Sequence, residues 1–171
     1  MRKFYFLFVI PLIYINACTS TVKKANETDF NGFITCVRDG DNACLKVLPD
    51  NVRGLNFEQS IMLRDALVNS LIKSPESTID ALNRIDKETA KTGHSFVKDN
   101  YGSDIVCAYM IDSNRYDRRS FFKYYFIAKS KIEKTGAKGK SCLEIMNSSV
   151  EETLQEEKLG KMKWGNETYP F

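Results

Sequence analysis

NFEQSIMLRDALVNSLIKSP, residues 56–75, is the strongest helical pattern in this chain. Its apolar side chains recur largely at intervals of three and four residues, which places them on one side of an α-helix. Asn56 is suited to cap the first turn, with Gln59 at the reciprocal position of a capping box. Ser74 and Pro75 both end this helix and begin the next, so the short joint predicts an αα-hairpin. The apolar positions are Phe57, Ile61, Leu63, Leu67, Val68, Leu71 and Ile72.

Shorter helices are predicted before this hairpin. Residues 29–47 favour two helices around a turn at 38–42, with Asp29 as the cap of the first. A break is expected at 48–51, because Pro49 lacks the N–H that a helix interior requires.

More helices are predicted after the hairpin. Its second helix is expected to end near Ile85 or Asp86, and the polar residues 87–100 predict a loop. Each later helix should begin at a side chain able to cap it. These capping residues are Ser103 or Asp104, then Asp117, then Ser141, and finally the capping-box pair Ser148 and Glu151.

These patterns together predict an all-α protein, a single helical bundle of about 6–7 helices over residues 29–160. The chain has 171 residues, a length that suits about one domain. It carries 25 basic and 22 acidic side chains, so it is close to neutral. Nucleic-acid binding needs a basic excess on one face, and no such partner is expected.

The first residues have the three parts of a secretory signal. Arg2 and Lys3 precede a run of apolar residues, 4–15, and the small residue Ala17 precedes Cys18. The apolar run is too short to cross a bilayer, which takes about 20 helical residues. Residues 1–17 are therefore expected to be a cleaved signal peptide.

Ile15, Ala17 and Cys18 resemble the lipobox of bacterial lipoproteins, although Asn16 is larger and more polar than that pattern usually has. The resemblance implies that Cys18 is acylated with palmitate-type chains and becomes the first mature residue. Residues 18–28 would then be a lipidated cysteine and a flexible tether. Thr19 after the cysteine implies, by the same resemblance, the periplasmic face of the outer membrane rather than the inner membrane. An ordinary cleaved signal and a retained membrane anchor are the alternatives.

The four other cysteines favour two disulfide bonds, because an exported chain with an even number of cysteines typically pairs them. Three pairings are open, of which we favour Cys36 with Cys44 and Cys107 with Cys142. Free thiols or a metal site are the alternatives. There is no CxxC spacing and the sole histidine is His94, so no metal is expected.

No pattern for catalysis or for a cofactor is found. His94 lies in a polar segment without a paired nucleophile, and Gly139-Lys140-Ser141 lacks the earlier glycine of a phosphate loop. The protein is therefore not expected to be an enzyme.

The tail, residues 161–171, is rich in aromatic side chains. Trp164, Tyr169 and Phe171 either pack back onto the bundle, which we favour, or bind a partner, because tryptophan and tyrosine are enriched at binding hot spots.

The order of the helices and of Cys107 and Cys142 is loosely similar to that of the periplasmic immunity proteins that neutralise type VI amidase effectors. That resemblance covers roughly residues 30–150. It implies a lipid-anchored, non-catalytic protein-binding module of the cell envelope, an inhibitor of a cell-wall-targeting effector. The alternative is a structural or accessory lipoprotein of envelope assembly.

Overall fold

The two helices of the hairpin at the centre of the fold begin where the sequence predicts. The computed structural model describes residues 27–52, 55–92, 101–111 and 113–171. Helix α3 (Phe57–Lys73) begins with the predicted capping box, in which the Gln59 N–H donates to Asn56 Oδ1 (2.9 Å) and the Asn56 N–H donates to Gln59 Oε1 (3.0 Å). Helix α4 (Pro75–Thr92) begins at the proline.

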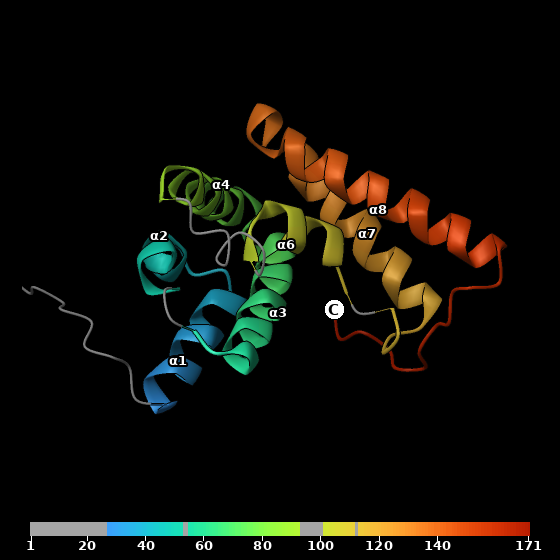
Figure 1. Ribbon diagram of the computed structural model, residues 1–171, viewed down its shortest axis with the longest axis horizontal. Helices are drawn as coiled ribbons and strands as arrows, with labels where there is room; N and C mark the ends of the chain where they lie inside the picture. The colour runs from blue at the N-terminus through green and yellow to red at the C-terminus, as the bar shows by residue number, and fades with distance from the viewer. Residues whose placement is uncertain (1–26, 53–54, 93–100, 112) are drawn as a thin grey trace, which may run out of the picture.

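The remaining described elements surround this hairpin (Figure 1). They are α1 (Glu27–Arg38), α2 (Asn42–Asn51), α6 (Ser103–Tyr109), α7 (Arg118–Glu133), the 3₁₀ helix η1 (Gly136–Gly139) and α8 (Lys140–Lys158). The predicted all-α bundle is confirmed.

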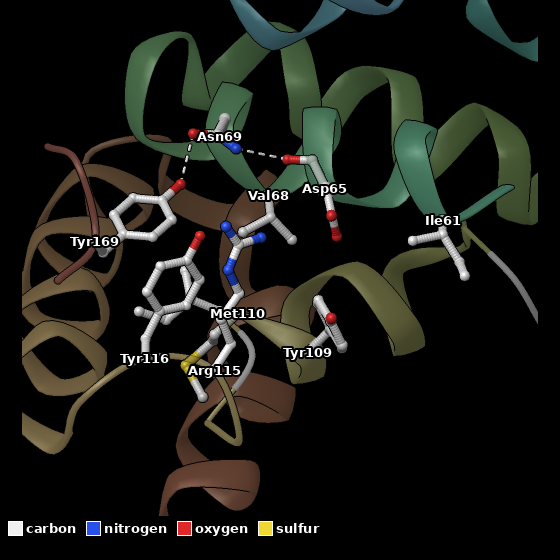
Figure 2. Close-up of a pocket in the computed structure, with 10 residues that line it drawn as sticks. Ile61, Asp65, Val68, Asn69, Tyr109, Met110, Arg115, Tyr116 and Tyr169 are labelled. Atoms are coloured by element: carbon white, nitrogen blue, oxygen red, sulfur yellow. Dashed lines mark hydrogen bonds between the residues drawn. The ribbon is translucent and has the colours of Figure 1, made fainter. Parts of the chain in front are cut away.

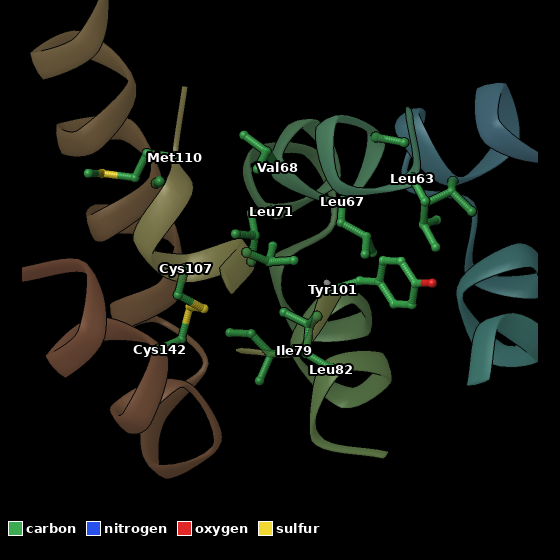
Figure 3. Close-up of a cluster of buried hydrophobic side chains, with 14 of the residues drawn as sticks. Leu63, Leu67, Val68, Leu71, Ile79, Leu82, Tyr101, Cys107, Met110 and Cys142 are labelled. Carbon is green, nitrogen blue, oxygen red and sulfur yellow. A yellow bond between two sulfur atoms is a disulfide. The ribbon is translucent and has the colours of Figure 1, made fainter. Parts of the chain in front are cut away.

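Helix α3 lies inside the bundle and contacts α1, α4, α6 and α7. Leu63, Leu67 and Leu71 follow one another at four-residue intervals and are fully buried (Figure 3). Burying a leucine side chain stabilises the folded state by about 1.5–3 kcal/mol, so this row is a major part of the core.

Two disulfide bonds join helices that are separate in sequence, in the pairing that we favoured. Cys36 pairs with Cys44, which joins α1 to α2, and Cys107 pairs with Cys142, which joins α6 to α8 (Figure 3). Asp41 lies between the first two cysteines and caps α2, accepting from the Ala43 N–H at 2.7 Å. The acidic turn therefore has a local structural role.

The expected break at 48–51 is wrong, because α2 continues through Pro49 to Asn51. A proline removes the hydrogen bond to the carbonyl four residues earlier, here that of Leu45. Arg84 of α4 supplies the missing donor: Nη2 donates to the Leu45 carbonyl (3.0 Å) and Nη1 to the Lys46 carbonyl (2.7 Å). A side chain 35 residues away in sequence thus lets the helix include the proline.

Three other predicted boundaries are also wrong. Helix α1 begins at Glu27, so Asp29 lies inside it, and α6 has Gly102 at its cap, with no side-chain hydrogen bond there. Helix α4 continues to Thr92, because the polar residues after Asp86 include good helix formers that extend an existing helix at low cost. His94 lies outside the described residues.

Helix α8 begins at Lys140, so the predicted cap Ser141 lies inside it, and Gly139 takes the cap position without a side-chain hydrogen bond. The helix is also continuous, so the predicted second start at Ser148 is wrong. Cys142, Met146 and Val150 lie at four-residue intervals and are all buried, so the apolar stripe passes through the predicted start without interruption. Asp117 does cap α7 as predicted, accepting from the Ser120 N–H at 2.6 Å. Within the described residues, no helix has the length and apolar content needed to span a membrane.

We expect Arg84→Ala to lower the free energy of unfolding by about 1–3 kcal/mol, because it removes both hydrogen bonds to α2 and leaves the Leu45 carbonyl, which Pro49 cannot serve, without a donor. In a Pro49→Ala background the cost should be smaller, since an alanine N–H is able to donate to the Leu45 carbonyl. Chemical denaturation of the four proteins of this double-mutant cycle measures the difference. Equal costs of Arg84→Ala in the two backgrounds would contradict the role given to Arg84.

Candidate functional site

A cleft opens between α3, the segment that follows α6, and the C-terminal tail (Figure 2). Its volume is about 260 Å³. The tyrosine Tyr169 stands at one end and Ile61 at the other, so the cleft runs along one face of α3 (Figure 2). The lining residues are Ile61, Asp65, Val68, Asn69, Tyr109, Met110, Ile111, Arg115, Tyr116 and Tyr169.

The α3 wall of the cleft follows from helical spacing. Ile61, Asp65 and Asn69 are four residues apart, so they share one face of the helix. All three side chains are half-buried, whereas the neighbouring Leu67 and Leu71 point into the core. One helix therefore contributes both the core and a wall of the cleft.

The opposite wall depends on pairing between the tail and the segment before α7. The Gly165 N–H donates to the Ser113 carbonyl (2.9 Å), the Glu167 N–H to the Arg115 carbonyl (3.1 Å), and the Asp117 N–H to the Glu167 carbonyl (2.8 Å). This pairing includes one parallel β-bridge between Tyr116 and Glu167. A Cβ atom on Gly165 would lie 2.1 Å from the carbonyl carbon and oxygen of Arg115, so only glycine fits this close approach.

Tyr169 attaches the tail to α7 and α3 through hydrogen bonds. Its N–H donates to Ser120 Oγ (2.9 Å) and its hydroxyl donates to Asn69 Oδ1 (Figure 2). The Asn69 Nδ2 group donates in turn to the backbone carbonyl of Asp65 (2.7 Å). Burial raises the pKa of Tyr169 to about 12, with smaller contributions from Tyr116 and Asp65. These hydrogen bonds fix the end of the cleft.

The backbone is strained at the base of the cleft. Met110, the residue after α6, has φ 47° and ψ −115°, although it is not a glycine and its side chain is buried. A residue held in a sparsely populated backbone region costs about 1–3 kcal/mol, and such residues cluster at functional sites. The strained residue Met110 is itself part of the cleft lining, so the backbone strain and the cleft lie at the same position.

Opposite charges face each other across the cleft. The Arg115 guanidinium lies 5.1 Å from the centre of the Tyr116 ring, and Figure 2 shows it between that ring and Asp65. Arg115 Nε also donates to Glu167 Oε2 (2.8 Å), and this hydrogen bond is the main cause of the raised pKa of Arg115. Tyr116 and Asp65 raise that pKa further by charge interaction.

A second arginine supports the wall at Tyr109. The Arg64 guanidinium stacks 3.7 Å from the centre of the Tyr109 ring, and its Nε lies 3.9 Å from Asp65 Oδ1. A cation over an aromatic face contributes about 0.5–2 kcal/mol and holds the ring in one orientation. The aromatic surface of the cleft is therefore preorganised on this side too.

The three aromatic tail residues singled out from the sequence lie in different places. Tyr169 is buried and forms part of the cleft. Trp164 is half-buried against Phe121 and Phe122, and its Nε1–H donates to Glu157 Oε1 (2.9 Å). Phe171 is 46% exposed and packs against the Tyr169 ring. The tail thus packs back onto the bundle, and only Phe171 of the three remains largely accessible.

The sequence did not indicate the most polar part of the cleft. Arg115 and Tyr116 precede the predicted cap Asp117, in a segment without an apolar pattern, and Asp65 and Asn69 are polar positions of a helix that is identified by its apolar ones. Arg115 and Tyr116 were a signal that the sequence offered, because arginine and tyrosine are each enriched at binding hot spots.

Metal-binding side chains are not gathered at the cleft. In the described ranges, the one group of potential ligands with donor atoms within 4.8 Å of each other is Cys36, Asp41 and Cys44, and its two sulfur atoms are joined as a disulfide. The cleft instead combines aromatic walls with polar side chains that are able to form hydrogen bonds.

We expect Gly165→Ala to detach the tail, because the added Cβ would overlap the Arg115 backbone. Tyr169 would then become solvated, and its pKa should fall from about 12 towards the ordinary tyrosine value of about 10. NMR titration of tyrosine side-chain Cζ resonances measures this. Gly32→Ala is the matched control, since a Cβ there has no neighbour within 4 Å. An unchanged Tyr169 titration in Gly165→Ala would show that the tail does not depend on this glycine.

Comparisons with models of protein families, with curated proteins and with solved structures return no match for this chain.

Proposed function

We propose that this protein is a lipid-anchored protein of the bacterial cell envelope that acts as a non-catalytic protein-binding module. The observation that carries the proposal is the cleft, whose walls are held in place by hydrogen bonds within the protein and whose lining is rich in tyrosine and includes arginine. Tyrosine and arginine are the side chains, with tryptophan, that dominate binding energy at protein interfaces.

Preorganisation is the second reason for preferring binding. Ordering flexible side chains at an interface costs about 0.5–1.5 kcal/mol for each one that is immobilised. Here Tyr169 is already bonded to Asn69, and Tyr109 already lies under Arg64. A partner would lose less free energy to ordering at such a surface.

Placement in the envelope is supported by two independent features of the chain. The segment 2–18 has the pattern of a lipoprotein signal, and two disulfide bonds join the helices of the body. Disulfide bonds persist mainly in oxidising compartments such as the periplasm. The outer membrane is the membrane that Thr19 favours, by its resemblance to sorting signals.

The partner class that we propose is a secreted enzyme directed against the cell wall, which this protein would inhibit. The basis is the loose similarity in helix order and cysteine placement to immunity proteins. A partner drawn from the machinery of envelope assembly would instead favour an accessory role.

Lipid attachment is expected to depend on Cys18. Metabolic labelling with a palmitate analogue should label the wild-type protein and the Ser20→Ala control, and should not label Cys18→Ser, which has no thiol to form the thioether. Label in Cys18→Ser, or no label in the wild type, would contradict the anchor.

Partner binding is expected at the cleft. A photo-crosslinking residue at Ile61, which lines the cleft, should give a discrete product with one partner in living cells. The same residue at Lys87, an exposed position of α4 that does not line the cleft, is the matched control. Arg115→Ala should reduce the Ile61 product several-fold. No product at Ile61, or the same products at both positions, would contradict the proposal, and mass spectrometry of the partner distinguishes a cell-wall enzyme from an assembly component.

A further inference from the structure

Helix α7 differs in charge from every other described helix. It carries more basic side chains than acidic ones, whereas each of the other described α-helices has at least as many acidic side chains as basic ones. The whole chain is close to neutral, with 25 basic and 22 acidic side chains, so the excess on α7 is local. The basic residues of α7 are Arg118, Arg119, Lys123, Lys129 and Lys131, and its acidic residue is Glu133.

Part of this charge is neutralised within the protein. Arg118 Nε donates to Glu157 Oε1 (2.7 Å), and the carboxylate of the cap Asp117 lies close enough to Arg119 for that charge to help lower its pKa. Asp117, Glu133 and Glu157 are still outnumbered by the basic side chains of α7. Arg119 and Lys123 are exposed and four residues apart, so they share the solvent side of the helix.

Aromatic rings lie on the same side. Phe126, three residues after Lys123, is 62% exposed, and Phe122 is half-buried one turn earlier. Lys123 Nζ lies 4.0 Å from the centre of the Phe171 ring, which is also accessible. A single exposed apolar side chain is common on soluble proteins, but here several aromatic rings alternate with cations. We call Arg119, Phe122, Lys123, Phe126 and Phe171 the outer face of α7.

This combination of side chains is typical of surfaces that rest on a lipid bilayer. Arginine and lysine are attracted to the phosphate groups of anionic lipids, and phenylalanine enters the boundary between headgroups and acyl chains. The acidic helix α8 packs beside α7 and would be repelled by the same lipids (Figure 1). The two helices together would therefore favour one orientation of the body at an anionic surface.

The proposed anchor would keep such a surface within reach. Helix α1 begins at Glu27, nine residues after Cys18, and nine extended residues span at most about 30 Å. A short connection of this kind gives a high effective concentration, so a contact too weak to hold a free protein on the membrane is enough to orient a tethered one. A soluble partner has no such advantage at the outer face of α7.

We propose that the outer face of α7 docks on the anionic phospholipid surface of the membrane that holds the anchor. Arg119 and Lys123 lie at the lipid phosphate groups, and the Phe126 ring enters the boundary with the acyl chains. This inference rests on the lipid anchor of the proposed function. The cleft lining contains no residue of α7, so docking and partner binding use different residues.

The test places one tryptophan on the outer face of α7 in the full-length, lipid-bearing protein. Two reporters share the substitution Trp164→Phe, which removes the natural tryptophan. One also carries Phe126→Trp. The matched control carries Phe57→Trp, at a phenylalanine that is 74% exposed at the start of α3. Both are reconstituted in phosphatidylcholine vesicles, with or without phosphatidylglycerol, whose acyl chains are brominated and quench nearby tryptophan.

The Phe126→Trp reporter should lose roughly half of its emission in brominated vesicles that contain phosphatidylglycerol, and much less in pure phosphatidylcholine. The Phe57→Trp reporter should lose little in either. Raising the salt concentration from about 0.1 M to about 1 M shortens the Debye length from about 10 Å to about 3 Å and should reverse most of the quenching.

Charge variants separate the outer face of α7 from net charge. In the Phe126→Trp reporter, Arg119→Gln with Lys123→Gln should lower the ratio of docked to undocked protein by about fivefold for each charge removed. Lys46→Gln with Lys87→Gln, at exposed lysines of α2 and α4, changes the net charge equally and should leave the quenching unchanged.

The outcomes that overturn the inference are distinct from those that overturn the proposed function. Protein that fails to float with the vesicles contradicts the anchor, and the inference with it. Protein that floats with no quenching of the Phe126→Trp reporter, or with equal quenching of both reporters, rejects the docking face and leaves the anchor and the binding cleft intact. A crosslinker at residue 126 that then captures an acidic envelope protein would assign the outer face of α7 to that partner instead.

Discussion

Helix α3 is packed on several sides at once, and this constraint determines much of the rest of the structure. Its contacts with α1, α4, α6 and α7 leave few positions open to water. Polar groups on such a helix must find partners within the protein, because a buried donor or acceptor without one costs about 1–3 kcal/mol. Ser70, which is fully buried, donates to the Leu67 carbonyl (2.9 Å) and accepts from Thr78 Oγ1 of α4 (2.9 Å).

The same requirement orients α7 against α3. The hydroxyl of the fully buried Tyr124 donates to the Val68 carbonyl at 2.7 Å. Desolvation raises the pKa of Tyr124 well above its ordinary value, so the side chain is neutral and able to donate. Lys131 of α7 also donates to the Ile72 carbonyl at the other end of the contact. These bonds fix how α7 crosses α3, and α7 in turn positions Ser120, the residue that holds the backbone of Tyr169.

The cleft is a product of this arrangement rather than of any one segment. One wall is the face of α3 that does not carry the buried leucines Leu63, Leu67 and Leu71. The opposite wall depends on the pairing of the tail with residues 113–117. Tyr169 joins the two walls through Asn69. The tyrosine-rich surface is thus held by contacts between residues about 50 and 100 positions apart in sequence. Such contacts carry no local pattern, so the sequence predicted that the aromatic tail packs back onto the bundle but not which residues it contacts there.

Local physics was enough to predict the secondary structure wherever a signal was strong and nearby. The capping residues of α3 and α7, the proline start of α4, the helical class and the two disulfide pairs were all predictable, because each depends on neighbouring residues or on the short list of pairings that four cysteines allow. The proposed lipid anchor at Cys18 rests on the sequence alone, because residues 1–26 lie outside the described structure. Tertiary structure decided the continuation of α2 through Pro49, where Arg84 supplies a donor from another helix, and the uninterrupted course of α8. It also decided the cleft, because Asp65 and Arg115 meet only after distant helices and the tail have packed.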